Sequence, residues 1–208
     1  GKDWDSAIST LPYWQEMYRI LKPGSHLNAF GSPKTYHRLT SMIEDSGFEI
    51  RDCLMWLYGS GFPKSHNHFG LARYGTCLKP AYEPIVLAMK PCEGTFAQNA
   101  EKWGLAGINI DASRIFTNDN LDRISSENTL YEGGWKKIDI KGNLSGRWPA
   151  NLILDEESAE MLDHQTGNNI SRFFYCAKAS SKERNAGLDK QCSHPTVKPI
   201  ALMKYLIK

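Results

Sequence analysis

The hexapeptide HPTVKP, residues 194–199, combines residue types that could bind a negatively charged group. It precedes an expected helix, and the first N–H groups of a helix have no partner within that helix. Together with the ammonium of Lys198, those N–H groups could bind a carboxylate. The structural alternative is that Pro195 and Pro199 only start the helix and that Lys198 is solvated. The residues of interest for binding are His194, Pro195, Thr196, Lys198 and Pro199.

A second group of chemically useful side chains lies in residues 58–70, YGSGFPKSHNHFG. This segment is longer and richer in glycine than a plain connection between two strands. Its aromatic rings could stack on a base and its basic groups could contact phosphates, which suits an extruded nucleotide. The side chains concerned are Tyr58, Phe62, Lys64 and His66, preceded by Trp56. For each aromatic residue taken singly, packing in the core is the alternative.

Two later segments, SGRWPAN (residues 145–151) and SRFFYCAKASSKERNAG (residues 171–187), mix basic and aromatic residues. Such segments could read DNA, and the candidates in them are Arg147, Trp148, Arg172 and Lys178. The alternative is a strand and a turn with solvated charges, because residues 92–193 carry 12 basic and 15 acidic side chains.

Two other clusters are assigned no chemistry. His66 and His68, taken with Cys77 and Cys92, have a spacing that fits no zinc pattern, so no metal site is predicted. Four carboxylates lie at positions 155, 156, 157 and 160, where they would stabilise the start of a helix through its dipole.

The elements that must position these residues follow one another as helix and strand. Helical periodicity covers residues 11–21, with a strand at 26–30. A second helix is expected to begin at Pro33, capped by Ser32, and to end before Gly47. Strands follow at 48–58 and 84–89. This order predicts an α/β fold, whereas residues 92–193 read as an irregular insert in which only 156–165 is clearly helical.

Composition limits the class of protein. The 208 residues carry a net charge of +2 and contain no apolar stretch long enough to span a bilayer, so neither a membrane protein nor a strongly basic nucleic-acid binder is indicated. The five cysteines show no CxxC spacing, and no basic and apolar leader opens the chain, which favours the reduced cytoplasm.

Three segments resemble the DNA amino-methyltransferases that modify adenine N6 or cytosine N4, in the permuted order that places the catalytic motif first. They are GKDWD with LKPGSHLNAFG (residues 1–5 and 21–31), GFEIRDCLMWLYGSGFPKSHN with KPAYEPIVLAMKP (residues 47–67 and 79–91), and HPTVKP. The resemblance implies a Rossmann-like fold, S-adenosylmethionine as cofactor and double-stranded DNA as partner, in the cytoplasm of a bacterium or a phage-infected host. It also implies that 1–91 form the target-base half, 92–193 the recognition insert and 194–208 the start of the cofactor half.

The sequence lacks two motifs of this family, the Asp-Pro-Pro-Tyr tetrapeptide and the glycine-rich cofactor loop. It therefore resembles an internal fragment, with catalytic residues expected before Gly1, and the isolated fragment is expected to be inactive. The expected activity is methyl transfer to adenine N6 in DNA. Two alternatives stay open: transfer to cytosine N4, and a DNA-binding remnant or specificity subunit that performs no chemistry.

Overall fold

A computed structural model describes residues 9–61, 77–124, 139–177, 181–189 and 197–208. The first part of the chain contributes α1 (Leu11–Ile20), β1 (His26–Phe30), α2 (Tyr36–Asp45), β2 (Glu49–Leu57) and β3 (Tyr82–Met89). The middle contributes α3 (Phe96–Trp103), α4 (Ile110–Ser113), β4 (Arg123–Ile124), β5 (Asp139–Ile140), β6 (Leu152–Asp155), α5 (Glu156–Thr166), the 3₁₀ turn η2 (Ser171–Phe173), β7 (Tyr175–Ala177) and α6 (Ser181–Asn185). The last element is α7 (Ile200–Leu206). Within these ranges no helix has the length and apolar content to cross a lipid bilayer.

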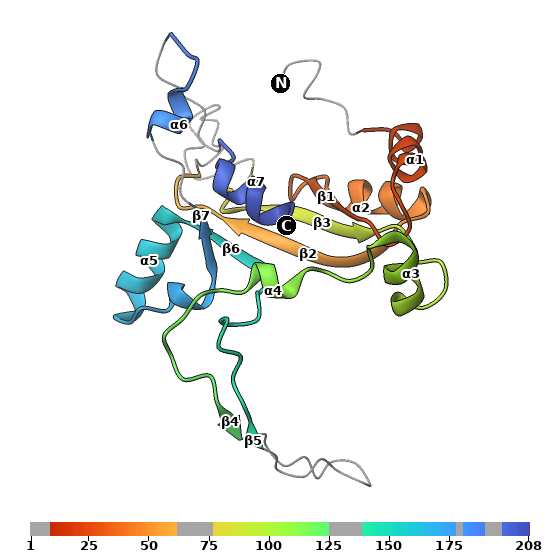
Figure 1. Ribbon diagram of the computed structural model, residues 1–208. Helices are drawn as coiled ribbons and strands as arrows, with labels where there is room; N and C mark the ends of the chain where they lie inside the picture. The colour runs from red at the N-terminus through yellow and green to blue at the C-terminus, as the bar shows by residue number, and fades with distance from the viewer. Residues whose placement is uncertain (1–8, 62–76, 125–138, 178–180, 190–196) are drawn as a thin grey trace, which may run out of the picture.

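Five strands form one mixed sheet in the order β1-β3-β2-β6-β7 (Figure 1). Strand β3 is antiparallel to both of its neighbours, whereas β2, β6 and β7 are parallel to one another. β1 therefore runs in the same direction as β2, β6 and β7. The predicted α/β class is confirmed, and the strands expected at 26–30, 48–58 and 84–89 correspond to β1, β2 and β3.

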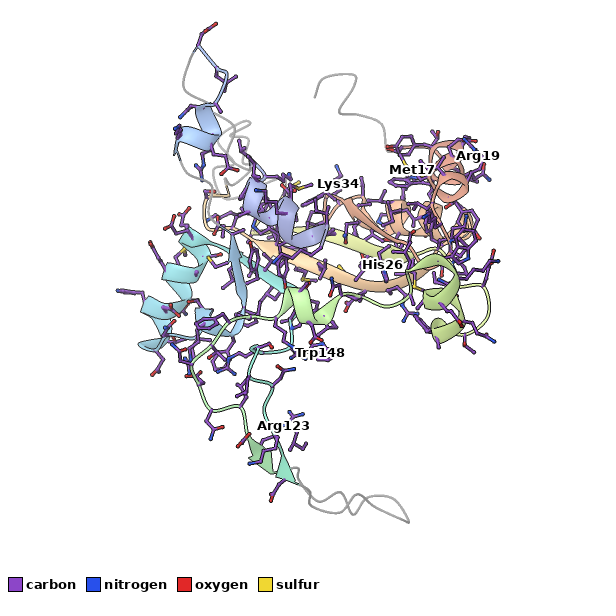
Figure 2. All side chains as sticks on the ribbon, viewed as in Figure 1. Met17, Arg19, His26, Lys34, Arg123 and Trp148 are labelled. Atoms are coloured by element: carbon purple, nitrogen blue, oxygen red, sulfur yellow. The ribbon has the colours of Figure 1, made fainter. Side chains whose placement is uncertain are left out.

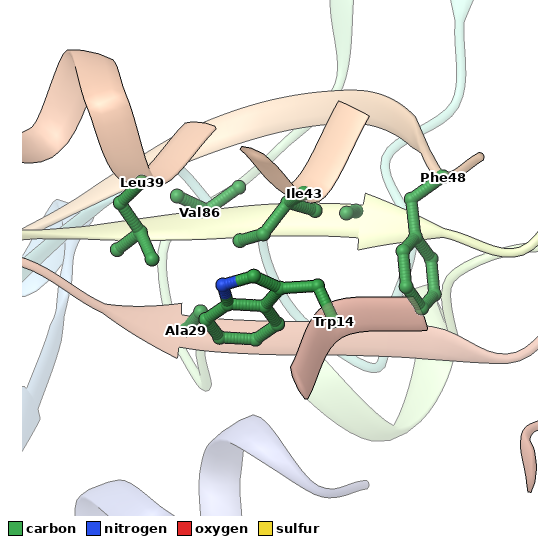
Figure 3. Packing of buried hydrophobic residues seen from close by; sticks show 7 residues of the cluster. Trp14, Ala29, Leu39, Ile43, Phe48 and Val86 are labelled. Carbon is green, nitrogen blue, oxygen red and sulfur yellow. The ribbon is translucent and has the colours of Figure 1, made fainter. Parts of the chain in front are cut away.

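Strand β3, which lies between β1 and β2, is buried on both faces because its alternate residues pack into two different cores. On one face, Val86 and Ala88 pack with Trp14, Ile43 and neighbouring side chains of α1 and α2 (Figure 3). On the other face, Ile85 packs with a cluster that includes Leu202 of α7. The sheet is thus covered by α1 and α2 on one side and by α7 on the other.

The second helix begins later than the sequence indicates. Ser32 and Pro33 belong to a turn in which the N–H groups of Thr35 and Tyr36 both donate to the Ser32 carbonyl, and α2 starts only at Tyr36. The predicted Ser32 cap is therefore wrong. The predicted stop is confirmed, because Gly47 adopts a φ of 107°, which favours glycine, and its N–H donates to the Glu44 carbonyl.

The middle of the chain is more regular than expected in two respects. Helix α3, which the sequence analysis did not predict, begins with a capping box between Thr95 and Gln98. Strands β6 and β7 extend the main sheet, with α5 between them. The described residues on either side of β4 and β5, 114–124 and 139–148, project away from the sheet (Figure 1). These two segments are called the arm.

Candidate functional site

The strands that share one direction end at the same edge of the sheet. At this edge lie Phe30 of β1, Leu57 of β2, Asp155 of β6 and Ala177 of β7. In α/β sheets, ligands bind in the crevice outside the carboxyl ends of parallel strands. The described residues leave a cavity of about 170 Å³ there, lined by Trp56, Tyr58, Asp155, Glu156, Glu157, Glu160, Ala177, Arg184, Val197 and Pro199. This edge is the candidate site.

The cavity is smaller than a pocket that encloses a whole drug-sized ligand, which takes roughly 300–1,000 Å³. Four of its lining residues are carboxylates from the end of β6 and the first turns of α5, opposed by the guanidinium of Arg184. Asp155 also caps α5, accepting from the Ser158 N–H at 2.7 Å. The helix start predicted from these carboxylates is confirmed, and they bring negative charge to the cavity.

Lys198 lies at this edge and its ammonium already has a protein partner. Lys198 Nζ is 2.5 Å from Glu83 Oε2 of β3. The ammonium also lies 5.4 Å from the ring centroid of Phe30 and 5.7 Å from that of Trp56. The solvated lysine of the structural alternative is therefore not observed. The sequence reading did not identify Glu83, because nothing in the linear pattern marks a glutamate at the start of an apolar strand.

The rest of the hexapeptide is described only in part. Pro199 precedes the first turn of α7, and its side chain is fully buried. The N–H of Ile200, the first in α7, donates to a carboxylate oxygen of Glu183 in α6. An anion thus already occupies the start of this helix. His194, Pro195 and Thr196 lie outside the described residues.

Two aromatic residues at the end of β2 form one wall of the cavity. Trp56 and Tyr58 are both buried, and their ring centroids are 5.8 Å apart. Within the part of the chain that the structure describes, the buried indole Nε1 of Trp56 has no hydrogen-bond partner, which is uncommon because buried polar atoms are nearly always paired. Burial raises the pKa of the Tyr58 phenol, and the negative charge of Glu83 raises it further. Tyr58, predicted to stack on a base, here packs on Trp56.

The glycines of the 58–70 segment allow two close approaches. A Cβ on Gly59 would collide with the Glu157 side chain, and a Cβ on Gly61 would overlap the Pro80 carbonyl oxygen. The ammonium of Lys79 donates to the Gly59 carbonyl at 3.1 Å. The start of this loop is therefore held against α5 and residue 80. Phe62, Lys64 and His66 lie outside the described residues.

The two arginines predicted to contact DNA converge on one carboxylate. Asp119 accepts from Arg147 and from Arg172 Nε, the latter at 3.1 Å. Both guanidinium groups lie 4.4 Å from the ring centroid of Phe173. The Arg172 hydrogen bond is the largest cause of the lowered pKa of Asp119, and Arg147 adds to it. Each arginine thus has an intramolecular role that ties the arm to η2.

Trp148, by contrast, is two-thirds exposed, at 66% (Figure 2). The Arg114 guanidinium lies 5.7 Å from its ring centroid and donates to the Gly146 carbonyl at 3.2 Å. The backbones of Ile115 and Arg147 form an antiparallel bridge that places Arg114 beside Trp148. Lys178 lies outside the described residues, and the residues that are described contain no His, Cys, Asp and Glu cluster able to hold a metal.

Comparison with known proteins identifies one family that matches nearly the whole chain. Residues 3–208 match the family model of the N6/N4 DNA methylases. The solved structure of M1.HpyAVI with SAM is 18% identical, with a TM-score of 0.29, and the match covers 39% of this chain and 36% of that one. TTHA0409 of Thermus thermophilus, a candidate DNA modification methylase, is 19% identical with a TM-score of 0.30, and the match covers 51% of this chain and 46% of that one. The matches thus span less than half of those proteins, and no curated protein matches.

Proposed function

The chain belongs to the N6/N4 DNA methylase family, and on that premise we propose that it takes part in transferring a methyl group from S-adenosylmethionine to adenine N6 in double-stranded DNA. The observation that carries the proposal is the meeting of the Val197–Pro199 segment with the ends of β2 and β3 at the carboxyl edge of the sheet. This edge is where a ligand is expected in an α/β protein.

The residues at this edge suit one end of S-adenosylmethionine. Its sulfonium and ammonium are positive, and the cavity is lined by carboxylates such as Asp155 and Glu157. Its carboxylate is negative and suits the ammonium of Lys198, which has three N–H donors and one carboxylate partner in the described residues. The cofactor supplies an activated methyl group when bound. The proposed contacts are those of Lys198 and Pro199, joined by His194, Pro195 and Thr196.

A carboxylate-lined cavity repels phosphates, so we propose that DNA contacts the protein outside this cavity. Trp148 is the strongest candidate, because base–aromatic stacking contributes about 1–3 kcal/mol per base and its ring is open to solvent. Lys64, His66, Phe62 and Lys178 complete the proposed contacts. Arg147 and Arg172 would reach phosphates only by sharing or leaving Asp119, and Tyr58 would contribute as a wall of the cavity.

In this proposal, residues 1–91 form the target-base half of the enzyme, 92–193 the recognition insert, and 194–208 the start of the cofactor half. The insert also completes the sheet through β6 and β7, so recognition and cofactor binding would share one rigid framework. Removal of the insert would then disturb the cavity as well as DNA binding.

The experiment is methylation of mixed-sequence DNA by the full-length protein with S-adenosylmethionine, followed by digestion to nucleosides and mass spectrometry. We expect N6-methyladenine. N4-methylcytosine without N6-methyladenine would assign the other amine. Calorimetry with S-adenosylmethionine on the same preparation separates an enzyme from a DNA-binding module, because only an enzyme requires a cofactor pocket. DNA binding with neither methylated base nor cofactor binding would contradict the proposal.

A further inference from the structure

Glu83 and Lys198 form an ion pair that is largely shielded from water. Their side chains are 17% and 33% exposed, and Nζ lies 2.5 Å from Oε2. Removing one partner from a shielded pair leaves an unpaired charge, which is strongly unfavourable. The pair also links two segments that lie 115 positions apart in the sequence. Its geometry therefore depends on the fold and not on local structure.

Side chains from three strands of the sheet surround the Lys198 ammonium. Glu83 of β3 lies directly opposite Trp56 of β2, and Phe30 at the end of β1 lies opposite Ile85 of β3. The rings of Phe30 and Trp56 both lie within 6 Å of the ammonium, a distance at which an aromatic face attracts a cation. The ends of three strands thus form a preformed receptor for one lysine side chain.

A lysine ammonium sits at the end of a flexible four-carbon chain and needs a fixed partner to hold one position. Glu83 supplies that partner and takes one of the three N–H donors. The Lys198 side chain stays one-third exposed, so its ammonium can donate to a second anion. When Glu83 fixes the position of the Lys198 ammonium, the remaining N–H donors have a defined direction toward the carboxylate of a bound ligand.

We infer that Glu83 is a positioning residue that holds the Lys198 ammonium at the carboxyl edge of the sheet, where it binds the carboxylate of S-adenosylmethionine. This role rests on the proposed function and assigns a residue to it that does not itself contact the cofactor. The opposite possibility is that Glu83 only neutralises Lys198 and competes with the cofactor. The two possibilities predict opposite effects when Glu83 is removed.

The test is calorimetric binding to the full-length protein of two ligands, S-adenosylmethionine and 5′-methylthioadenosine, which lacks the carboxylate. Glu83→Ala is expected to weaken S-adenosylmethionine binding on the order of tenfold, the size of coupling seen between residues in contact. Binding of 5′-methylthioadenosine should not change. In a Lys198→Ala background, Glu83→Ala should have no further effect on either ligand.

Glu49→Ala is the matched control. Glu49 lies on β2 at the opposite end of the same sheet, and it too is ion-paired, with Arg51 at 3.6 Å. Its removal should leave both affinities unchanged. Thermal unfolding of each variant checks the fold, and Glu83→Gln, which keeps the shape of the side chain and removes its charge, replaces Glu83→Ala if the latter does not unfold cooperatively.

Unchanged or tighter binding of S-adenosylmethionine by folded Glu83→Ala would overturn the positioning role. So would a loss that persists in the Lys198→Ala background. Both results leave the proposed function standing, provided that the unaltered protein binds S-adenosylmethionine. If the unaltered protein does not bind it, the proposed function fails, and the role of Glu83 fails with it.

Discussion

The rings of Tyr175 and Tyr205 stack face to face, with centroids 3.8 Å apart and planes 6° apart. Tyr175 comes from β7 and Tyr205 from α7, so the stack joins the last strand of the sheet to the helix that follows HPTVKP. The Tyr175 hydroxyl donates to the Ala201 carbonyl and the Tyr205 hydroxyl to the Ser113 carbonyl, each at 3.1 Å. These contacts fix the helix that follows Lys198 on the sheet.

Alkaline pH is expected to loosen α7. Burial raises the pKa of Tyr205 to about 12, and Tyr175 adds to the shift. A phenol ionises near pH 10 in the unfolded chain, so the unfolded state binds fewer protons above that pH. The contribution of the neutral Tyr205 phenol to the stability of the folded state is therefore complete below about pH 10 and is lost as the pH rises towards 12. Urea unfolding between pH 8 and 11.5 measures the decline, which Tyr205→Phe should reduce. An equal slope in Tyr205→Phe would contradict this assignment.

Lys198→Ala is expected to weaken S-adenosylmethionine binding by about 1.5–3 kcal/mol, the worth of a charge-assisted hydrogen bond. The loss should appear in the dissociation constant measured by calorimetry. Lys204→Ala is the control, because Lys204 lies exposed in α7, the helix that follows Lys198. If both variants bind S-adenosylmethionine like the unaltered protein, HPTVKP acts only in starting the helix.

Asn99→Ala is expected to destabilise the fold by about 1–3 kcal/mol, the cost of leaving buried polar groups unpaired. The Asn99 side chain is fully buried, donates to the Pro23 carbonyl at 3.0 Å and accepts from the Glu93 N–H at 2.9 Å. It therefore joins α3 to the turn before β1. Urea unfolding gives the free energy, and Glu101→Ala, an exposed change on the same helix, should lie within about 0.5 kcal/mol of the unaltered protein.

Gly61→Ala is expected to displace the loop after β2, because the new Cβ would overlap the Pro80 carbonyl oxygen. Trp56 lines the adjacent cavity, so its fluorescence and the affinity for S-adenosylmethionine should both change. Gly107→Ala is the matched control, since a Cβ there meets nothing within 4 Å. Identical spectra and affinities for the two variants would show that the loop does not support the cavity.

Asp119→Asn is expected to loosen the base of the arm. The hydrogen bonds from Arg172 and Arg147 hold the pKa of Asp119 below its ordinary value, so its contribution to stability is present above about pH 3.8 and is lost as the pH falls through the lower folded value. Faster hydrogen exchange of the Ile115 and Arg147 amides, which bond each other's carbonyls, would report the change. Asp122→Asn, farther along the arm, should leave these two amides protected.

Much of the framework follows from the sequence because it depends on local patterns. The apolar run of β3 predicts a strand buried on both faces, and the carboxylates that begin at Asp155 predict the start of a helix there, where α5 begins at Glu156. The segments that resemble the DNA amino-methyltransferases also indicate the family on their own, because a motif is recognised from its residue types and spacing. The prediction failed at Ser32 and Pro33, because a serine followed by a proline is typical both of a helix start and of a turn. Here the two residues form the turn that precedes α2.

The tertiary structure alone decided which side chains meet. Strand pairing places Glu83 beside Trp56, and only the docking of α7 brings Lys198 to them. Arg147 and Arg172 read as free cations in sequence, but the folded arm gives them one shared carboxylate, Asp119. Contacts between residues far apart in the chain depend on register and packing, which a one-dimensional pattern does not encode. The site residue that sequence reasoning missed, Glu83, is of this kind.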